Sequence, residues 1–351
     1  MNETILNSRQ RLILSLISQS QGLGREEIQE KVAGEHPVSR PTIIRDLNHL
    51  SEAGLIRFSG RGRSTLYLPF SSNPLLRPFD LKSYFSLEPD ERPVVKKQFD
   101  FDVFRYLKDL LAPEEKQEIQ RTKRSFNGQI ERLDPTIFKR ELERFTIELS
   151  WKSAKIEGNT YTLLETEALL KEAELAPGKT KEEAQMILNH KDAFSQIFEH
   201  RQDFKRISLS LVNQLHQTMV RELGITAGIR RQAVGITGTN YRPPDNEHQI
   251  REALQKLVVV INKNQHPVEK ALIATAFISY IQPFTDGNKR TGRMLANAIL
   301  MAHDYFPISY RSIREEELKK ALIVFYERGS IFNFKKLFLE QLFFSYRNYF
   351  K

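Results

Sequence analysis

The feature that most constrains how this chain folds is a polar stretch, QPFTDGNKRTGR at residues 282–293, set between two apolar runs. Residues 271–281 before it and residues 294–301 after it both have the apolar pattern of helices. A Gly-Asn turn at the start of a helix presents free backbone amides, and these favour a bound anion. We therefore expect two helices joined by a turn that binds an anionic ligand.

The charged side chains of this stretch support the same interpretation. Arg290 and Arg293 are three residues apart, so both project from one face of the first helical turns. Guanidinium groups on that face suit phosphate oxygens, and Asp286 is placed to hold Mg²⁺, which commonly uses one or two carboxylates plus the phosphates of the substrate. The alternative is a helix-capping loop with solvated cations, which any one of these residues alone would indicate.

The stretch resembles the signature of the Fic (Fido) family, HPFxDGN-G/K-RxxR, whose members typically transfer AMP from ATP to a protein hydroxyl. The matching positions are Pro283, Phe284, Asp286, Gly287, Asn288, Arg290 and Arg293, and Lys289 follows the variant of the Doc branch. The resemblance implies an ATP site with the following roles: ATP contacts from Gly287, Asn288, Lys289, Arg290 and Arg293, a catalytic role for Asn288, and Mg²⁺ at Asp286.

Gln282 departs from the pattern, because the family has the general-base His at this position. An imidazole with a pKa near 6.5 accepts a proton at neutral pH, whereas the amide of glutamine only donates and accepts hydrogen bonds. Losing a positioned base typically removes on the order of 10²–10⁴ in rate. We expect ATP binding to survive this change and fast transfer not to.

A second motif, SAKIEGN at residues 153–159, resembles the inhibitory motif of the family, (S/T)xxxE(G/N), through Ser153, Glu157 and Gly158. The resemblance implies that Glu157 pairs with Arg293 and blocks productive placement of the γ-phosphate, since a carboxylate and a phosphate compete for one guanidinium. In some relatives this Glu also assists the reverse reaction. The alternative is a solvated charge at a helix end.

Residues 233–244, AVGITGTNYRPP, predict a short β-hairpin, because apolar residues alternate around Gly238 and two prolines close the segment. The resemblance implies that this hairpin, with Gly238 and Tyr241, is a flap that lies over the site and holds a target by strand addition. The alternative is an ordinary surface hairpin.

The first seventy residues predict three helices followed by a basic strand pair, an order that resembles a winged helix-turn-helix domain. The third helix, after Ser39, is expected to turn Ile44, Leu47 and Leu50 inward. The resemblance implies DNA binding through a recognition helix and a wing, with the contacts made by Arg40, Thr42, Arg45, Arg61 and Arg63. Nine basic against seven acidic residues leave only +2 over residues 1–70, so protein contact or dimerisation is the alternative.

Residues 71–97 predict a proline-rich linker, and the resemblance implies a Fic domain at residues 98–351 with the inhibitory helix in its N-terminal part. We expect a mainly α protein: an all-helical Fic fold with a short β-hairpin flap, plus the small winged helix-turn-helix domain. The aromatic residues of the last twenty positions predict packing onto the body, with a homodimer contact as the alternative.

Composition excludes several classes of function. The absence of cysteine excludes disulfides, thiol catalysis and cysteine zinc sites, and no apolar run approaches the roughly 20 residues of a membrane span. The N-terminus lacks a signal-peptide layout, so a cytoplasmic protein is expected. The spacing around His216 indicates a packed helix rather than a substitute base.

Two function classes follow from these motifs. One is a protein adenylyltransferase that uses Mg²⁺ and ATP on an unidentified protein target. The other is a DNA-binding transcriptional regulator whose inactive Fic domain senses the nucleotide.

Overall fold

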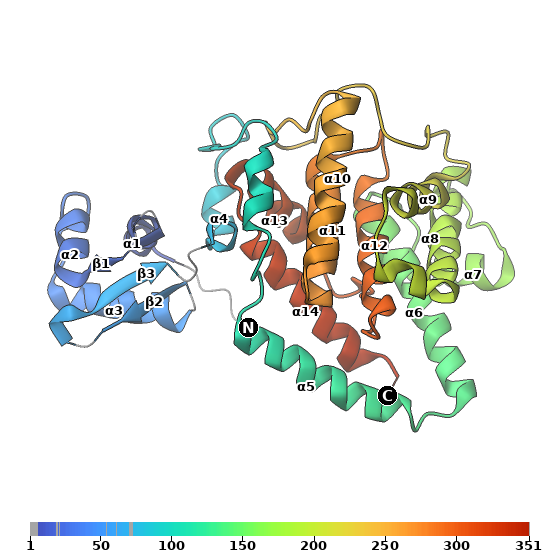
Figure 1. Ribbon diagram of the computed structural model, residues 1–351, viewed down its shortest axis with the longest axis horizontal. Coiled ribbons are helices and arrows are strands. Elements are labelled where there is room, and N and C mark those ends of the chain that lie inside the picture. Colours follow the sequence, from blue (N-terminus) through green and yellow to red (C-terminus); the bar gives the residue numbers. More distant parts are fainter. Residues whose placement is uncertain are drawn as a thin grey trace.

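The computed structural model describes residues 6–18, 20, 22–53, 55–60, 62–69 and 73–350, without the side chain of residue 63. The chain is mainly helical, as expected (Figure 1). The helices are α1 Ser8–Ser18, α2 Arg25–Ala33, α3 Arg40–Glu52, α4 Leu81–Tyr84, α5 Pro113–Ile130, α6 Pro135–Ile156, α7 Leu163–Glu172, α8 Lys181–Glu199, α9 Leu209–Val220, α10 Glu247–Lys263, α11 Pro267–Ile281, α12 Asn288–Ala302, α13 Glu315–Arg328 and α14 Phe332–Asn348. The strands are β1 Leu23–Gly24, β2 Ile56–Ser59 and β3 Leu66–Pro69.

The N-terminal part is a small unit of its own, with helices α1–α3 beside an antiparallel sheet in the order β1-β3-β2 (Figure 1). Its separate core has Ile13, Leu47 and Leu50 fully buried. The helices and the two later strands lie where the sequence predicts them, and their interpretation as a winged helix-turn-helix domain stays a prediction. Arg61, one of the predicted wing residues, lies outside the described residues.

The predicted inward face of α3 was wrong by one position. Ile43, not Ile44, is fully buried, in line with Leu47 and Leu50. Asp46 also points inward, where its carboxylate accepts hydrogen bonds from Arg9 at 2.5 Å and from Gln10 at 3.0 Å. These bonds compensate the burial of a charge on that face, and they rotate the apolar stripe toward Ile43.

Residues 73–97 do not form a free linker. The prolines do interrupt helix formation, as predicted, but Leu75 and Leu76 belong to the main core. Arg92 is also buried and pairs with Glu327 of α13 at 3.2 Å. The apolar and charged contacts that hold this segment were not visible in its proline-rich composition.

Helices α11 and α12 form the centre of the helical body (Figure 1). Every residue from 268 to 281 is buried, so α11 is covered on all sides and is a core helix. Gly292 permits the close approach of α12, because a Cβ there would lie 3.1 Å from the carbonyl oxygen of Thr275. This packing fixes the turn between the two helices, where the signature lies.

Replacing Gly292 with alanine is expected to destabilise the protein by about 1–3 kcal/mol, because an added methyl overpacks a buried helix pair. The matched control is Gly128→Ala in α5, where a Cβ would meet nothing within 4 Å. This control should instead gain up to about 1 kcal/mol from helix propensity. Chemical denaturation of both variants measures the difference, and equal stabilities would contradict the packing role of Gly292.

The predicted β-hairpin around Gly238 was wrong. Residues 232–244 contain no strand and run as a loop with a turn at Thr237 and Gly238. The backbone groups of this loop bond elsewhere: Arg242 exchanges hydrogen bonds with residues 97–99, and the side chain of Arg230 donates to the carbonyls of Gln232 and Pro244. These partners replace the cross-strand ladder that alternation alone predicts.

The aromatic C-terminus packs onto the body, as expected. Phe334, Phe338, Tyr346, Tyr349 and Phe350 are all buried. A homodimer contact stays a prediction. Nowhere in the described residues does a helix combine the length and apolar character that crossing a bilayer requires.

Candidate nucleotide-binding site

The signature forms a tight turn between α11 and α12. Gln282 ends α11 in the left-handed conformation, and Gly287 caps α12 with φ 77°. A Cβ at Gly287 would lie 2.8 Å from Val220 Cγ1, so only glycine fits there without rearrangement. The side chain of Asn288 accepts from the backbone amide of Phe284 at 2.9 Å and donates to its carbonyl at 2.8 Å. The turn is therefore held from inside by its own asparagine.

The amide of Gln282 is engaged on both sides. Its Nε2 donates to the carbonyl of Ser279 at 2.7 Å, and its Oε1 accepts from Asn288 Nδ2 at 3.0 Å. The backbone carbonyl of Gln282 also accepts from Arg230 Nε at 2.7 Å. Gln282 thus fixes the shape of the turn and offers no basic nitrogen to a nucleophile.

Arg290 is a buried cation beside the turn. Its side chain is 2% exposed, and its guanidinium donates to Asp286 Oδ2 at 3.2 Å and to the carbonyl of Met219 at 3.4 Å. Burial lowers the pKa of Arg290, and the Asp286 carboxylate opposes that effect. Asp286, itself largely exposed, is the one carboxylate that pairs with this guanidinium among the described residues, so Arg290 retains charge for an anionic ligand.

The pair of Glu157 and Arg293 forms as the sequence motif implies. Arg293 Nη1 lies 2.8 Å from Glu157 Oε1, and Lys289 Nζ lies 3.4 Å from Glu157 Oε2. Gly158, with φ 99°, turns the chain at the end of α6. Ser153 accepts from Arg293 Nε at 2.9 Å through its hydroxyl and from Nη2 at 2.8 Å through its carbonyl. Ser153 and Glu157 therefore both contact Arg293, Glu157 also contacts Lys289, and Gly158 follows the helix that carries them.

The Glu157 carboxylate is strongly held in its charged form. Burial alone would raise the pKa of Glu157, but the charges of Arg293 and Lys289 outweigh it and lower the pKa to about 2. Since the ordinary value is 4.5, the carboxylate stays ionised throughout the neutral range.

This lowered pKa predicts an acid-sensitive contribution to stability. Because the folded pKa of Glu157 lies below its unfolded value, the contribution is complete above about pH 4.5 and is lost as the pH falls toward 2, with a size on the order of 3 kcal/mol. Denaturation of wild type and Glu157→Gln should show a constant difference from pH 7 to 5 that shrinks below. The exposed Glu174→Gln is the matched control, and a gap that persists unchanged to pH 3 would contradict the pairing.

Asp286 fits the role of a single Mg²⁺ ligand. Its side chain is 67% exposed, with one oxygen accepting from the Gly287 amide at 2.6 Å and the other facing Arg290. In the described part of the chain no three His, Asp or Glu side chains cluster as a metal site. An exposed lone carboxylate is compatible with an ion that keeps its waters and takes its other ligands from phosphates.

Two histidines lie against the site. His216 is buried as expected, stacks on Phe284 with centroids 3.7 Å apart, and places Nε2 3.0 Å from the carbonyl oxygen of Asp286. Burial lowers the pKa of His216 to about 4. The sequence offers no placement for His190 of α8. In the structure its Nε2 lies 2.8 Å from Ser153 Oγ. No local motif signals this contact, because the two residues come from different helices.

Tyr241, Arg40, Thr42 and Arg45, which were also predicted as site residues, do not contact this cluster. Tyr241 is buried and donates to the carbonyl of Tyr280 at 2.9 Å, so it packs the loop against α11. In the N-terminal unit, Arg40 and Arg45 are exposed on α3, and Thr42 is half-buried beside them.

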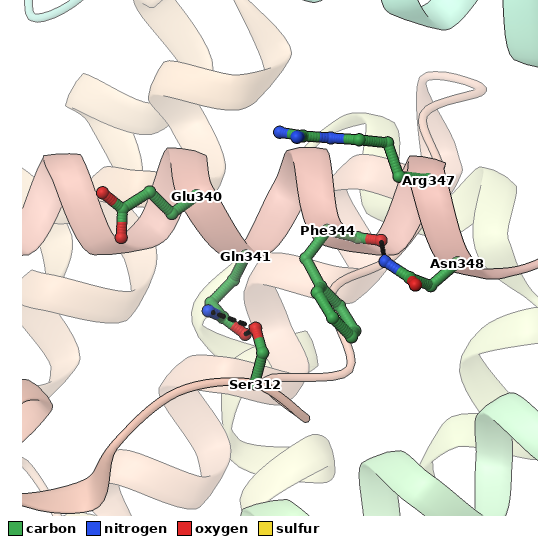
Figure 2. Close-up of a pocket in the computed structure, with 6 residues that line it drawn as sticks. All are labelled: Ser312, Glu340, Gln341, Phe344, Arg347 and Asn348. Carbon is green, nitrogen blue, oxygen red and sulfur yellow. Dashed lines mark hydrogen bonds between the residues drawn. The ribbon is translucent and has the colours of Figure 1, made fainter. Parts of the chain in front are cut away.

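A surface hollow on α14 has no signature residue in its lining. It is lined by Ser312, Glu340, Gln341, Phe344, Arg347 and Asn348. Figure 2 shows Gln341 and Ser312 hydrogen-bonded to each other across it, at 2.9 and 3.1 Å. The candidate site is therefore assigned from the signature residues and not from this hollow.

Comparison with known proteins supports the assignment. Residues 206–300, which contain the signature, match the Fic/DOC family. The protein adenylyltransferase Fic of Nematostella vectensis is 29% identical over 177 residues, which cover 49% of this chain and 42% of that protein. Its counterpart from Drosophila mojavensis is 31% identical over 164 residues, covering 45% and 32%. The chain thus spans less than half the length of these relatives.

Solved structures show the same fold. Fic-1 from C. elegans aligns with a TM-score of 0.57 at 17% identity, covering 97% of each chain. A Fic-domain signaling protein from Bacteroides thetaiotaomicron aligns at 0.55 with 22% identity, covering 66% of this chain and 94% of that one. The chain therefore shares the fold of these Fic proteins, and the match of residues 206–300 to the Fic/DOC family falls on the segment that holds the glycine turn and the buried cations.

Proposed function

We propose that this chain binds Mg-ATP and transfers AMP to a protein hydroxyl, restrained by Glu157 and slowed by Gln282. The observation that supports it most is the pair of buried guanidiniums, Arg290 and Arg293, which are 2% and 3% exposed beside the glycine turn. Burying two cations is costly unless a partner compensates them. Asp286 and Glu157 compensate them in the free protein. The phosphates of ATP would replace Glu157 in this role, with Lys289 and the amides after Gly287 adding further donors.

In the proposed reaction a target hydroxyl oxygen attacks the α-phosphorus of ATP, and the bond to the departing pyrophosphate breaks. The proton of the hydroxyl passes to solvent water, because the amide of Gln282 cannot accept it. Asn288 holds the turn in shape while the cations bind the phosphates. Mg²⁺ held at Asp286 would neutralise phosphate charge. Slow transfer of AMP is therefore expected even when Glu157 no longer occupies Arg293.

Label transfer from α-labelled ATP to the protein itself or to lysate proteins tests this proposal. γ-Labelled ATP is the control, because only AMP transfer retains the α-phosphate. Label from α-labelled ATP in Glu157→Gly would support an adenylyltransferase. Absence of label in Glu157→Gly and also in Glu157→Gly with Gln282→His would overturn it.

A nucleotide-responsive DNA-binding protein is the second candidate, favoured by the exposed arginines on α3. Arg40 and Arg45 lie on a unit with its own core, and Arg11 of that unit faces Asp80 of the following segment at 3.4 Å. In this proposal residues 1–70 form a winged helix-turn-helix domain whose recognition helix is α3, with Thr42, Arg61 and Arg63 as further contacts.

Replacing Arg40 and Arg45 together with alanine is expected to weaken DNA binding across sequences and to reduce its salt dependence by about two units of slope, one for each lost phosphate contact. Fluorescence anisotropy against salt concentration measures both effects. The matched control is Lys139→Ala with Arg140→Ala, an exposed pair on α6 with the same change of charge. Wild-type protein that binds no DNA at low salt would end this candidate.

A further inference from the structure

His190 lies at the end of a hydrogen-bonded chain that reaches the signature. Its side chain is fully buried, with Nδ1 2.7 Å from the carbonyl oxygen of Met186 and Nε2 2.8 Å from Ser153 Oγ. Ser153 Oγ in turn lies 2.9 Å from Arg293 Nε. Helix α8 thereby contacts Arg293 through a single hydroxyl of α6.

The two end groups of this series of hydrogen bonds, the Met186 carbonyl and the Arg293 guanidinium, determine which atom donates in each bond. A carbonyl only accepts, so His190 Nδ1 must carry the proton that is shared with Met186. A guanidinium only donates, so Ser153 Oγ must accept from Arg293. The serine proton therefore points to His190 Nε2, which is the bare nitrogen. Burial lowers the pKa of His190 to about 3, in keeping with a neutral ring.

The contacts of Arg293 divide into two sets. Nε and Nη2 both donate to Ser153, to its hydroxyl and its carbonyl, while Nη1 donates to Glu157. Loss of the Glu157 contact would free Nη1 and leave the two bonds to Ser153 in place. Ser153 thus holds the guanidinium through Nε and Nη2, and Nη1 is the nitrogen for which Glu157 and a ligand compete.

We propose that His190 is a positioning residue for the nucleotide site: by orienting the Ser153 hydroxyl as an acceptor, it keeps Nη1 of Arg293 directed at a phosphate once Glu157 withdraws. This proposal rests on the proposed binding of ATP. It assigns different tasks to neighbouring contacts, since Glu157 competes with the ligand whereas Ser153 and His190 hold the residue that binds it.

The test compares ATP and adenosine binding in the Glu157→Gly background by calorimetry. Adding His190→Leu is expected to weaken ATP binding about tenfold, as for one lost charge-assisted hydrogen bond, with adenosine binding unchanged. His190→Gln, which keeps an acceptor, should restore most of the ATP affinity. ATP affinity within twofold of the parent in His190→Leu would overturn the proposal.

Two controls separate positioning from loss of stability. His303→Leu removes a histidine with the same type of bond, Nδ1 to the carbonyl four residues earlier at 3.0 Å, away from Ser153. Ile197→Ala opens a cavity in α8 itself. Both should retain the ATP affinity of the parent, and a loss in either equal to that of His190→Leu would overturn the proposal. If His190→Leu does not fold, Ser153→Ala replaces it, with the same expected loss for ATP alone.

A ligand-free measurement keeps this proposal distinct from the proposed function. Nitrogen chemical shifts of His190 in the wild type should show a protonated Nδ1 and a bare Nε2, and exchange of the Arg293 Nε proton should accelerate in Ser153→Ala. The opposite tautomer would overturn the inference even if ATP binds. Failure of Glu157→Gly to bind ATP, with the expected tautomer and exchange, would instead count against the proposed function.

Discussion

Replacing Glu157 with glycine is expected to tighten ATP binding by roughly 10- to 100-fold. In the wild type the carboxylate occupies Arg293 Nη1 at 2.8 Å and also faces Lys289, so a phosphate must displace it from both cations. Removing a competitor for a buried guanidinium is worth about 1.4–2.8 kcal/mol on the scale of such pairs. Calorimetric titration of ATP into the full chain measures the change.

The control for this prediction is Glu174→Gly, which removes the same charge from an exposed position. It should leave ATP affinity unchanged. Equal affinities in wild type and Glu157→Gly would show that the carboxylate does not obstruct the ligand. Equal gains in both variants would show that the effect comes from net charge and not from Arg293.

Restoring histidine at position 282 in the Glu157→Gly protein is expected to raise the rate of AMP transfer by about 10²–10⁴, the usual contribution of a positioned base. The amide of Gln282 is tied to Ser279 and Asn288, so it can neither move to a nucleophile nor accept a proton there. An imidazole could keep one hydrogen bond in the turn and leave its other nitrogen basic.

Initial rates of labelling from α-labelled ATP measure this second effect. Gln282→Met is the control, since it keeps the size of the side chain without a base and should not accelerate transfer. Similar rates for Gln282 and for histidine at that position would mean that another group takes the proton. ATP affinity should stay within a few-fold in all three proteins, which separates chemistry from binding.

Local sequence predicted the parts of the site that a single turn determines. The glycine cap at Gly287 follows from the local sequence, and the structure confirms it. The spacing of Arg290 and Arg293 predicts a shared face, and the charges of both act on the Glu157 carboxylate, although their hydrogen bonds go to different partners. The contact of Glu157 with Arg293 joins distant segments, so only the resemblance to a known motif predicted it.

Features that depend on packing between helices were not predictable in this way. His190 gains its position because α8 packs on α6, and no periodicity in either helix encodes that contact. The loop around Gly238 alternates like a hairpin, yet Arg230 satisfies its carbonyls and removes the need for a strand partner. Likewise, the proline-rich segment packs on the helical body because Arg92 forms a buried ion pair with Glu327, which its composition does not indicate.

If Glu157 acts on the ligand through Arg293, a double-mutant cycle on ATP affinity will reveal the coupling between the two residues. The four proteins are wild type, Glu157→Gly, Arg293→Met and the combination of both, each titrated with Mg-ATP. We expect Glu157→Gly to tighten binding when Arg293 is present and to lose most of that gain when Arg293 is replaced, since only the longer contact with Lys289 then remains. The same gain in both backgrounds would contradict it, because Glu157 would then oppose ATP without competing for that guanidinium.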